Sequence, residues 1–229
     1  MIDKSVATVE DAVAEIADGS TIMIGGFGPA GAPFELLAAL ARRRAKDLTL
    51  ISNNAGTREI GISALLHAGL VRKMICSYPR SSDSVIFNEL YRDGKIELEL
   101  VPQGNLAARI QAAGEGLGGI YTPVGYGTDL TKDKESRCIN GVNYVFELPL
   151  KADVALIHGH CGDRWGNLSY SKAGRNFCPI MAMAATYTIA EVTHLVGLGD
   201  IDPENIITPG IFVQCIVPLP AHTPPATTV

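Results

Sequence analysis

Short apolar runs and amphipathic segments alternate through the first half of the chain. Apolar runs of strand length occur at 21–24, 48–51, 73–77 and 96–101. Between them, apolar residues recur at intervals of three and four, which places them on one face of a helix. This spacing predicts helices from Pro33, over 60–69, from Asp83 to Tyr91 and over 106–113. The alternation predicts an α/β fold: a doubly wound, mainly parallel sheet with right-handed crossovers and helices on both faces.

A further helix is expected before the first strand. Thr8 and Asp11 have the spacing of a capping box, with Asp in place of the usual Glu. Apolar residues from Val9 to Ile16 then follow at helical spacing. The chain is therefore expected to enter the sheet from a capped helix.

The second half of the chain has less regular elements. Residues 137–146 predict a β-hairpin, because Asn140-Gly141 suits the two central positions of its turn. Further strands are expected at 154–158, 168–171, 188–192 and 211–217, and a helix at 180–185. No repeat or linker divides the chain. We therefore expect one domain over 1–218 with a small antiparallel insertion, followed by a flexible tail over 219–229.

The segment from Asp18 to Pro33 reads as a turn, a buried strand, a glycine-rich loop and the start of a helix. Pro33 suits the first helical position, where a missing N–H costs nothing. Such a loop gathers backbone N–H groups and the positive end of a helix, which suits a phosphate, a carboxylate or a developing oxyanion. A tight strand-to-helix turn without any ligand remains an alternative.

The loop also matches the dinucleotide-binding pattern G-x-G-x-x-G over Gly26–Gly31. That pattern needs an acidic residue about 20 residues further on, at the end of the second strand, to hold a ribose hydroxyl. Here the second strand ends in asparagines, and the nearest acid, Asp47, lies before that strand. A dinucleotide-binding oxidoreductase is thus a distant alternative.

Polar residues follow several of the predicted strands. Ser52–Gly56 follows the second strand, Ser77–Pro79 the third and Gln103–Asn105 the fourth. The carboxyl ends of parallel strands share one edge, where ligands of such sheets bind. These residues bind and polarise but do not attack, and Glu35 and Glu59 lie where a helix dipole favours an acid anyway. The edge therefore reads as half of an active site, without its reacting group.

Charge and cysteine content narrow the classes further. The formal net charge is −5, and the only basic cluster, Arg42–Arg44, falls in the last turn of a predicted helix, where we expect a solvated terminus. Nucleic-acid binding is not indicated, because the negative charge implies no basic surface. A membrane span is not indicated either, since no apolar run approaches about 18 residues. Five scattered cysteines without C-x-x-C fit free thiols in a reducing cytoplasm.

His158-Gly159-His160-Cys161 invites a metal interpretation, because alternate residues of a strand share a face. A third ligand is not evident at motif spacing, although Asp163 is near. We therefore expect two ordinary histidines at a strand end and no metal.

Residues Asp18 to Pro33 spell Asp-Gly-x-x-(apolar)₃-Gly-Gly-Phe-x₃-Gly-x-Pro, which resembles the signature of the A (alpha) subunit of class I CoA-transferases. Further blocks resemble that family in the same order, over about 1–218: Ser52–Gly56, Pro102–Leu106, Tyr121–Pro123 and Ala173–Phe177. The details look closest to the members that act on 3-oxoadipate, and the acetoacetate (3-oxoacid) members are similar. One departure is His158–His160, where many members carry lysine.

The resemblance implies a ping-pong mechanism in which a glutamate of a B subunit forms the covalent intermediates. It implies a heteromer, no permanently bound cofactor, and CoA thioesters such as succinyl-CoA as substrates. By residue match, Asn53, Asn54 and Gln103 would contact the substrate acid or orient that glutamate. The segment matched to CoA contact comprises Gly25, Gly26, Phe27, Gly28, Pro29, Ala30 and Gly31. A non-catalytic acyl-CoA binding module also remains open.

Overall fold

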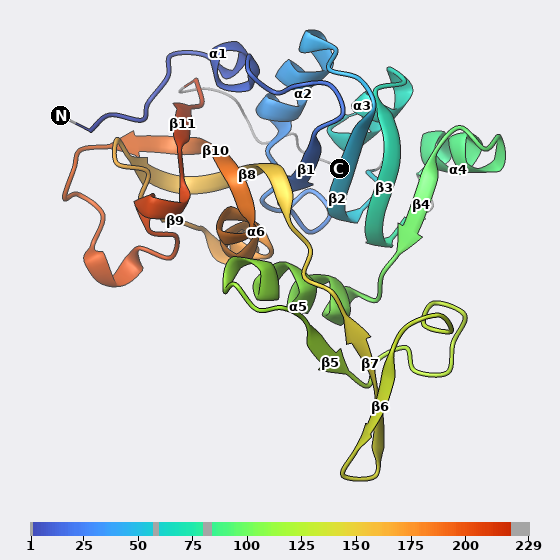
Figure 1. Cartoon of the computed structure of the whole chain (residues 1–229). Helices are drawn as coiled ribbons and strands as arrows, with labels where there is room; N and C mark the ends of the chain where they lie inside the picture. Colours follow the sequence, from blue (N-terminus) through green and yellow to red (C-terminus); the bar gives the residue numbers. More distant parts are fainter. Residues whose placement is uncertain (1, 57–59, 80–83, 221–229) are drawn as a thin grey trace.

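The computed structural model describes residues 2–56, 60–79 and 84–220. Within them, the main sheet is eight-stranded, and β9 (Leu168–Ser169) pairs with β8 alone. The other strands are parallel and lie side by side in the order β11 (Cys215–Pro218), β10 (Ala185–Val196), β8 (Ala152–Asp163), β1 (Thr21–Ile24), β2 (Leu48–Asn54), β3 (Val71–Tyr78) and β4 (Glu97–Leu100) (Figure 1). The order reverses at β1, so the chain winds outward on both sides of it, as predicted for a doubly wound fold.

Helices cover both faces of this sheet, each over its own buried core. The first face carries α1 (Val9–Val13), α2 (Phe34–Arg43), α3 (Ile62–His67) and α4 (Val85–Arg92). The second carries α5 (Gln103–Gly114) and α6 (Cys178–Ala184) (Figure 1). Apolar residues of β1 alternate between the two cores: Ile22 and Ile24 face the first, and Met23 faces the second. This sandwich arrangement buries both faces of the central strands, as parallel sheets require.

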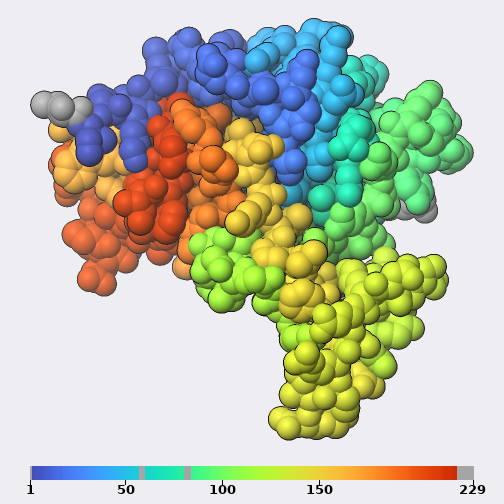
Figure 2. All heavy atoms as spheres, viewed as in Figure 1, coloured from blue at the N-terminus to red at the C-terminus, as the bar shows by residue number. Residues whose placement is uncertain are grey.

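A lobe projects from the body below α5 (Figures 1 and 2). It is built on a small antiparallel sheet of β5 (Ile120–Thr122), β7 (Val142–Glu147) and β6 (Ser136–Ile139), in that order. Asn140 and Gly141 connect β6 to β7 with φ angles of 50° and 78°. The predicted hairpin and its turn are thus confirmed, since this turn type needs positive φ at both central positions.

Several predicted boundaries shift. The first helix keeps its cap, since Thr8 Oγ1 accepts the Asp11 N–H at 3.1 Å, but it ends at Val13 rather than Ile16. β2 runs on to Asn54, and α5 begins at Gln103 rather than Leu106. In both places, polar residues that were expected in loops belong to regular elements. Asn53 and Asn54 are part of β2, which pairs with β3, and Gln103 to Asn105 form the first turn of α5.

The second half of the chain also differs in detail. β8 and β10 are both twelve residues long, far beyond the apolar runs that predicted them, because they pair with one another along most of their length. The last strand begins at Cys215, and Gly210–Phe212 before it forms a 3₁₀ turn. Two further 3₁₀ turns occur within the described residues, at Lys172–Arg175 and Pro203–Asn205.

The arginine run lies at an exposed helix end and also contacts α1. Arg42 makes an exposed ion pair with Glu10 at 2.5 Å. Arg43 Nε donates to the carbonyl oxygens of Val13 and Ala14, at 3.1 and 2.8 Å. All three arginines are exposed at the end of α2, which confirms the predicted solvated terminus, and Arg43 in addition links the end of α2 to the end of α1.

Three sequence-based predictions lie outside the described residues: the start of a helix at Asp83, the helix-start position of Glu59 and residues 221–229 of the tail. Within the described chain, no helix is long and apolar enough to cross a bilayer.

Candidate functional site

The glycine loop folds as a tight turn directly after β1. Phe27 and Ala30 exchange backbone hydrogen bonds, N to O, at 3.0 and 3.3 Å. Gly26 has a φ of 122° and Gly28 a φ of 58°, which L-residues with a side chain rarely adopt. The sequence needs glycine at these two positions for the turn itself, before any ligand is considered.

Most of the N–H groups that the loop was expected to offer are used within the chain. Gly25 N donates to Leu156 O at 2.9 Å, and Gly26 N donates to Asn176 Oδ1 at 2.9 Å. At the start of α2, Leu36 N donates to Glu191 Oε2 at 2.9 Å. The prediction of open amides at the helix start is thus wrong at Leu36, because the buried side chain of Glu191 on β10 already accepts this N–H.

Asn176 is a structural determinant of the loop that the sequence did not single out. Its Oδ1 accepts from Gly26 N, and its Nδ2 donates to Ala30 O at 2.9 Å and to Ala173 O at 2.8 Å. A Cβ built on Gly31 would lie 2.3 Å from Gly174 O, so the two segments are in direct contact. The available signal is the block Ala173–Phe177, which stands out in the sequence only through its family resemblance.

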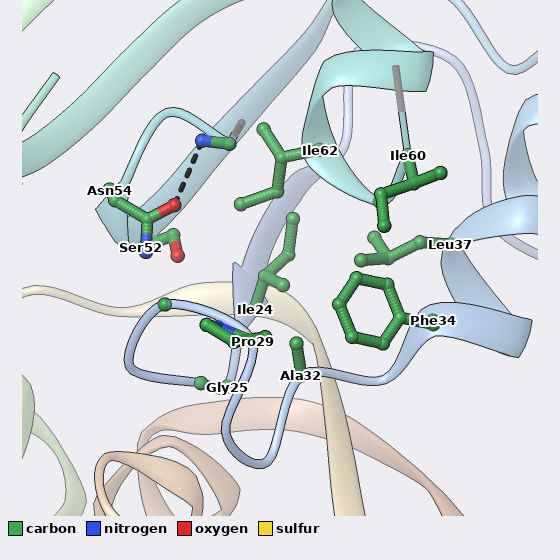
Figure 3. A pocket seen from close by; sticks show the side chains of 14 residues that line it. Ile24, Gly25, Pro29, Ala32, Phe34, Leu37, Ser52, Asn54, Ile60 and Ile62 are labelled. Carbon is green, nitrogen blue, oxygen red and sulfur yellow. Dashed lines mark hydrogen bonds between the residues drawn. The ribbon is translucent and has the colours of Figure 1, made fainter. Parts of the chain in front are cut away.

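A pocket opens beside the loop, between the end of β2 and the start of α3 (Figure 3). One wall is apolar and includes Phe34, Leu37 and Ile62. Ser52 and Asn54 add polar atoms on the opposite side, and Asn54 Oδ1 accepts from Gly56 N at 2.8 Å (Figure 3). The remaining lining comes from Ile24, Gly25, Gly26, Gly28, Pro29, Ala32, Gly56, Ile60 and Gly61.

Asn53 points to the other face of the sheet, toward α5. Its Oδ1 accepts from Ser77 Oγ at 2.7 Å and from Gln103 Nε2 at 2.7 Å. Gln103 is exposed on the first turn of α5, whereas Asn53 is only 4% exposed. We call Asn53, Ser77 and Gln103 the amide cluster.

The structure therefore divides the three predicted substrate residues. It brings Asn53 and Gln103 into direct contact, and it places Asn54 beside the glycine loop in the pocket. The reason is that consecutive residues of a strand point to opposite faces, and β2 continues through both asparagines. The two groups share the carboxyl edge of the sheet but not one cavity.

His158 and Glu191 form a second polar contact behind the loop. His158 Nδ1 lies 3.1 Å from Glu191 Oε1, and its Nε2 lies 3.2 Å from Thr193 Oγ1. Burial raises the pKa of Glu191, and the hydrogen bonds from His158 and Leu36 N oppose that rise. The His160 ring packs edge-on against His194 at 5.1 Å between centroids.

These contacts give both histidines partners within the protein. No three His, Cys, Asp or Glu side chains of the described chain are grouped so as to hold a metal ion. Cys161 is a free thiol.

The described residues of this edge do not supply an obvious nucleophile. Desolvation raises the pKa of Cys76 to about 12 and that of Cys178 to about 12, so both thiols stay protonated near neutral pH. No carboxylate is among the described residues that line the pocket. The edge offers an apolar wall, amide groups and hydroxyls.

Comparison with known proteins decides the family. Residues 6–218 match the family described as Coenzyme A transferase. The chain belongs to this family. It is 63% identical to the A subunit of 3-oxoadipate CoA-transferase from Pseudomonas putida, over 95% of this chain and 94% of that protein. It is 60% identical to the protein of that name from Acinetobacter baylyi, over 96% of both chains.

One further sequence relative and one solved structure are similar over most of the chain. The A subunit of a probable succinyl-CoA:3-ketoacid coenzyme A transferase from Bacillus subtilis is 42% identical, over 93% of this chain and 89% of that one. Glutaconate coenzyme A-transferase from Acidaminococcus fermentans superposes with a TM-score of 0.83 at 22% identity, covering 95% of this chain and 76% of that chain. This last likeness speaks for the fold alone. The predicted family and fold class are confirmed.

Proposed function

We propose that this protein is the A subunit of a heteromeric transferase that moves CoA from succinyl-CoA to 3-oxoadipate. One observation carries the proposal: identities of 63% and 60% over nearly the whole length of two relatives with that name. The similar relatives named for 3-ketoacids are 41% to 46% identical. A protein that acts on acetoacetate or another 3-oxo acid is the alternative.

We further propose that the reacting glutamate comes from a partner B subunit. The names of the relatives, which describe each as one lettered subunit of a transferase, and the missing nucleophile at this edge both support a second chain. In the expected sequence, a glutamate oxygen attacks the thioester carbon of succinyl-CoA, and the CoA thiolate leaves, which gives a mixed anhydride. The thiolate then attacks the glutamyl carbon and releases succinate, which leaves an enzyme–CoA thioester. The same steps in reverse deliver CoA to 3-oxoadipate.

The chain's own part in this scheme is to bind and polarise. Each addition places negative charge on an acyl oxygen, which N–H donors stabilise most strongly in the transition state. Asn53 and Gln103 are the proposed donors at the amide cluster, and Asn54 is the proposed polar contact in the pocket. The loop from Gly25 to Gly31, with the apolar wall beside it, is the proposed contact for the CoA thioester. CoA enters as substrate, with no permanently bound cofactor.

The family match covers residues 6–218, which supports the proposal of one transferase domain over 1–218. Free cysteines at all five positions support work in a reducing compartment, which we propose to be the cytoplasm.

The test is to purify the chain alone and with a co-expressed B subunit, and to measure CoA exchange. We expect exchange between succinyl-CoA and 3-oxoadipate only with both subunits. Full activity of the isolated chain would contradict the partner glutamate. A much higher kcat/KM for acetoacetate would favour the alternative substrate, and binding of CoA esters without any exchange in the complex would favour a binding module.

A further inference from the structure

Ser77 anchors the amide cluster from the neighbouring strand. The register of β2 and β3 places it beside Asn53, on the same face of the sheet. Its Oγ lies 2.7 Å from Asn53 Oδ1 and 3.0 Å from the Asn53 carbonyl oxygen. One short side chain thus contacts both the backbone and the amide of Asn53.

These contacts determine which group Asn53 presents. A carbonyl oxygen has two lone pairs, and Ser77 Oγ and Gln103 Nε2 occupy both on Oδ1. Asn53 Nδ2 has no hydrogen-bond partner among the described residues. It is not sealed in the protein either, since Asn88 Oδ1 is the one fully buried side-chain N or O atom without a partner in the described chain. Asn53 is therefore left with an open donor at the edge of the sheet.

We propose that Ser77 is a positioning residue for CoA transfer: its hydroxyl holds the Asn53 amide so that Nδ2 faces the acyl oxygen on which charge develops. The proposal rests on the proposed function and adds a residue to the same site. Ser77 itself touches no reacting atom. It is the better anchor of the two, because a serine on a paired strand loses little side-chain entropy, whereas Gln103 is long and exposed.

The expected kinetic signature follows from this geometry. A donor aimed at a developing oxyanion stabilises the transition state more than the bound substrate, so its loss lowers kcat more than it raises KM. When Ser77 is removed, the amide keeps its Gln103 contact but can rotate away. The expected loss is about 10-fold, below the roughly 100-fold typical of deleting a direct oxyanion donor.

The experiment uses the complex with the B subunit, assayed with succinyl-CoA and 3-oxoadipate. We compare wild type, Ser77→Ala and Ser77→Thr, which keeps the hydroxyl. Ser20→Ala is the matched control, because Ser20 Oγ donates to Ala17 O at 2.7 Å at the opposite end of the strands. Ser77→Ala should lower kcat about 10-fold with KM changed less than about 2-fold, Ser77→Thr should recover most of kcat, and Ser20→Ala should leave kcat unchanged.

Two results would overturn the inference: a Ser77→Ala complex with wild-type kcat, or a loss of kcat in Ser77→Thr as large as in Ser77→Ala. If Ser77→Ala does not assemble, Ser77→Cys, with a weaker donor of similar shape, decides instead: it should assemble and show reduced kcat at similar KM, and wild-type kcat would overturn the inference. Failure of the wild-type complex to transfer CoA would contradict the proposed function rather than the role of Ser77.

Discussion

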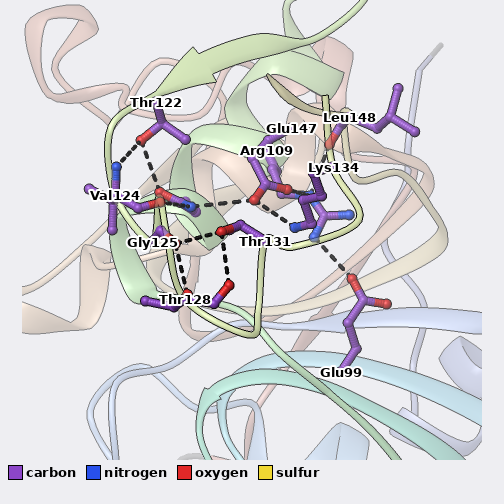
Figure 4. Close-up of polar contacts among 11 residues, drawn as sticks. Glu99, Arg109, Thr122, Val124, Gly125, Thr128, Thr131, Lys134, Glu147 and Leu148 are labelled. Atoms are coloured by element: carbon purple, nitrogen blue, oxygen red, sulfur yellow. Dashed lines mark hydrogen bonds and ion pairs between the residues drawn. The ribbon is translucent and has the colours of Figure 1, made fainter. Parts of the chain in front are cut away.

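Two polar clusters flank α5, and they are built in opposite ways. The amide cluster at the start of the helix is neutral and ends in an open donor. The second cluster, which we call the lobe root, lies where the antiparallel lobe joins the body, and it consists of the charged residues Glu99, Arg109, Lys134 and Glu147 (Figure 4).

The lobe root is a closed set of charges. Glu147 is 2% exposed, and Lys134 Nζ contacts its Oε1 at 2.7 Å. Arg109 Nε lies 3.8 Å from Glu147 Oε2 and donates to Leu148 O at 2.9 Å, while its Nη1 contacts Glu99 at 3.0 Å. Glu99 on β4 and Arg109 on α5 belong to the body, whereas Lys134 and Glu147, on β7, belong to the lobe.

The difference shows how a structural cluster that connects two parts of the fold can be distinguished from a cluster that can bind a ligand. A buried charge is costly unless the protein itself compensates it. A charged cluster in which every member is paired therefore stabilises the fold and has no free group for a ligand. A neutral amide costs less to leave half satisfied, so it can keep a donor for a ligand. By this measure the lobe root fixes the lobe, whereas the amide cluster keeps a donor available, in line with the substrate contact proposed for it.

The largest expected effect is the loss of the buried charge at the lobe root. Glu147→Gln leaves Lys134 without its counter-charge and should lower the free energy of unfolding by about 3 kcal/mol. Glu97→Gln is the matched control, because its pair with Arg72 at 3.1 Å is exposed and should cost less than about 1 kcal/mol. Denaturant unfolding of both variants measures this, and equal losses would remove the distinction between a buried joint and a surface pair.

A change at the amide cluster should affect chemistry more than stability. Asn53→Asp keeps an acceptor for Ser77 and Gln103 but replaces the open donor by a carboxylate oxygen. We expect kcat/KM of the complex to fall by about 100- to 1,000-fold. The free energy of unfolding should fall by less than about 1.5 kcal/mol, because two donors already point at the new carboxylate. Steady-state kinetics beside thermal unfolding tests this, and near-normal kcat/KM would show that Asn53 donates nothing to the transition state.

Acid should weaken the lobe root before it affects the amide cluster. Burial raises the pKa of Glu99, but hydrogen bonds from Lys73 and Arg109 outweigh that effect, so its pKa lies below the ordinary value. A lowered folded-state pKa contributes stability above the unfolded-state pKa, and this stability is lost as pH falls through the folded value. Glu99→Gln should therefore show a shallower loss of stability below about pH 4.5 than wild type, by less than about 1 kcal/mol. Identical pH profiles would mean that the Glu99 pairs add no stability.

The smallest expected effect is the coupling between the two clusters through α5. Asn53→Asp and Glu147→Gln share no hydrogen-bond partner in the described chain. Their effects on unfolding should therefore add to within about 0.5 kcal/mol in the double variant. A larger interaction energy would mean that α5 transmits strain between the lobe and the site.

The strand–helix alternation predicted the architecture well because it depends on local apolar periodicity. The parallel sheet with its shared carboxyl edge follows from it. The hairpin follows instead from its turn residues Asn140-Gly141. The limits of the elements were less predictable. Asn53 and Asn54 favour loops by propensity, and only pairing with β3 extends β2 through them.

Contacts between distant segments could not be predicted from local sequence patterns. Glu191 bonds to Leu36, 155 residues away, and Asn176 bonds to Gly26 across 150 residues. No spacing rule in the sequence connects either residue to the loop. The sequence therefore predicted where the glycine loop lies, but it could not predict the hydrogen-bond partners of its N–H groups, because these come from distant segments.

The opposite orientations of Asn53 and Asn54 have a consequence for how this site can change by mutation. The two adjacent amides lie on opposite faces of the sheet, because consecutive positions of β2 alternate between the pocket side and the α5 side. A substitution alters one side and leaves the other intact. Adding or removing a single residue earlier in the paired strand would instead exchange the two sides together, moving Asn53 to the pocket and Asn54 to α5. The length of this strand segment is therefore as much a part of the site as the identity of its side chains.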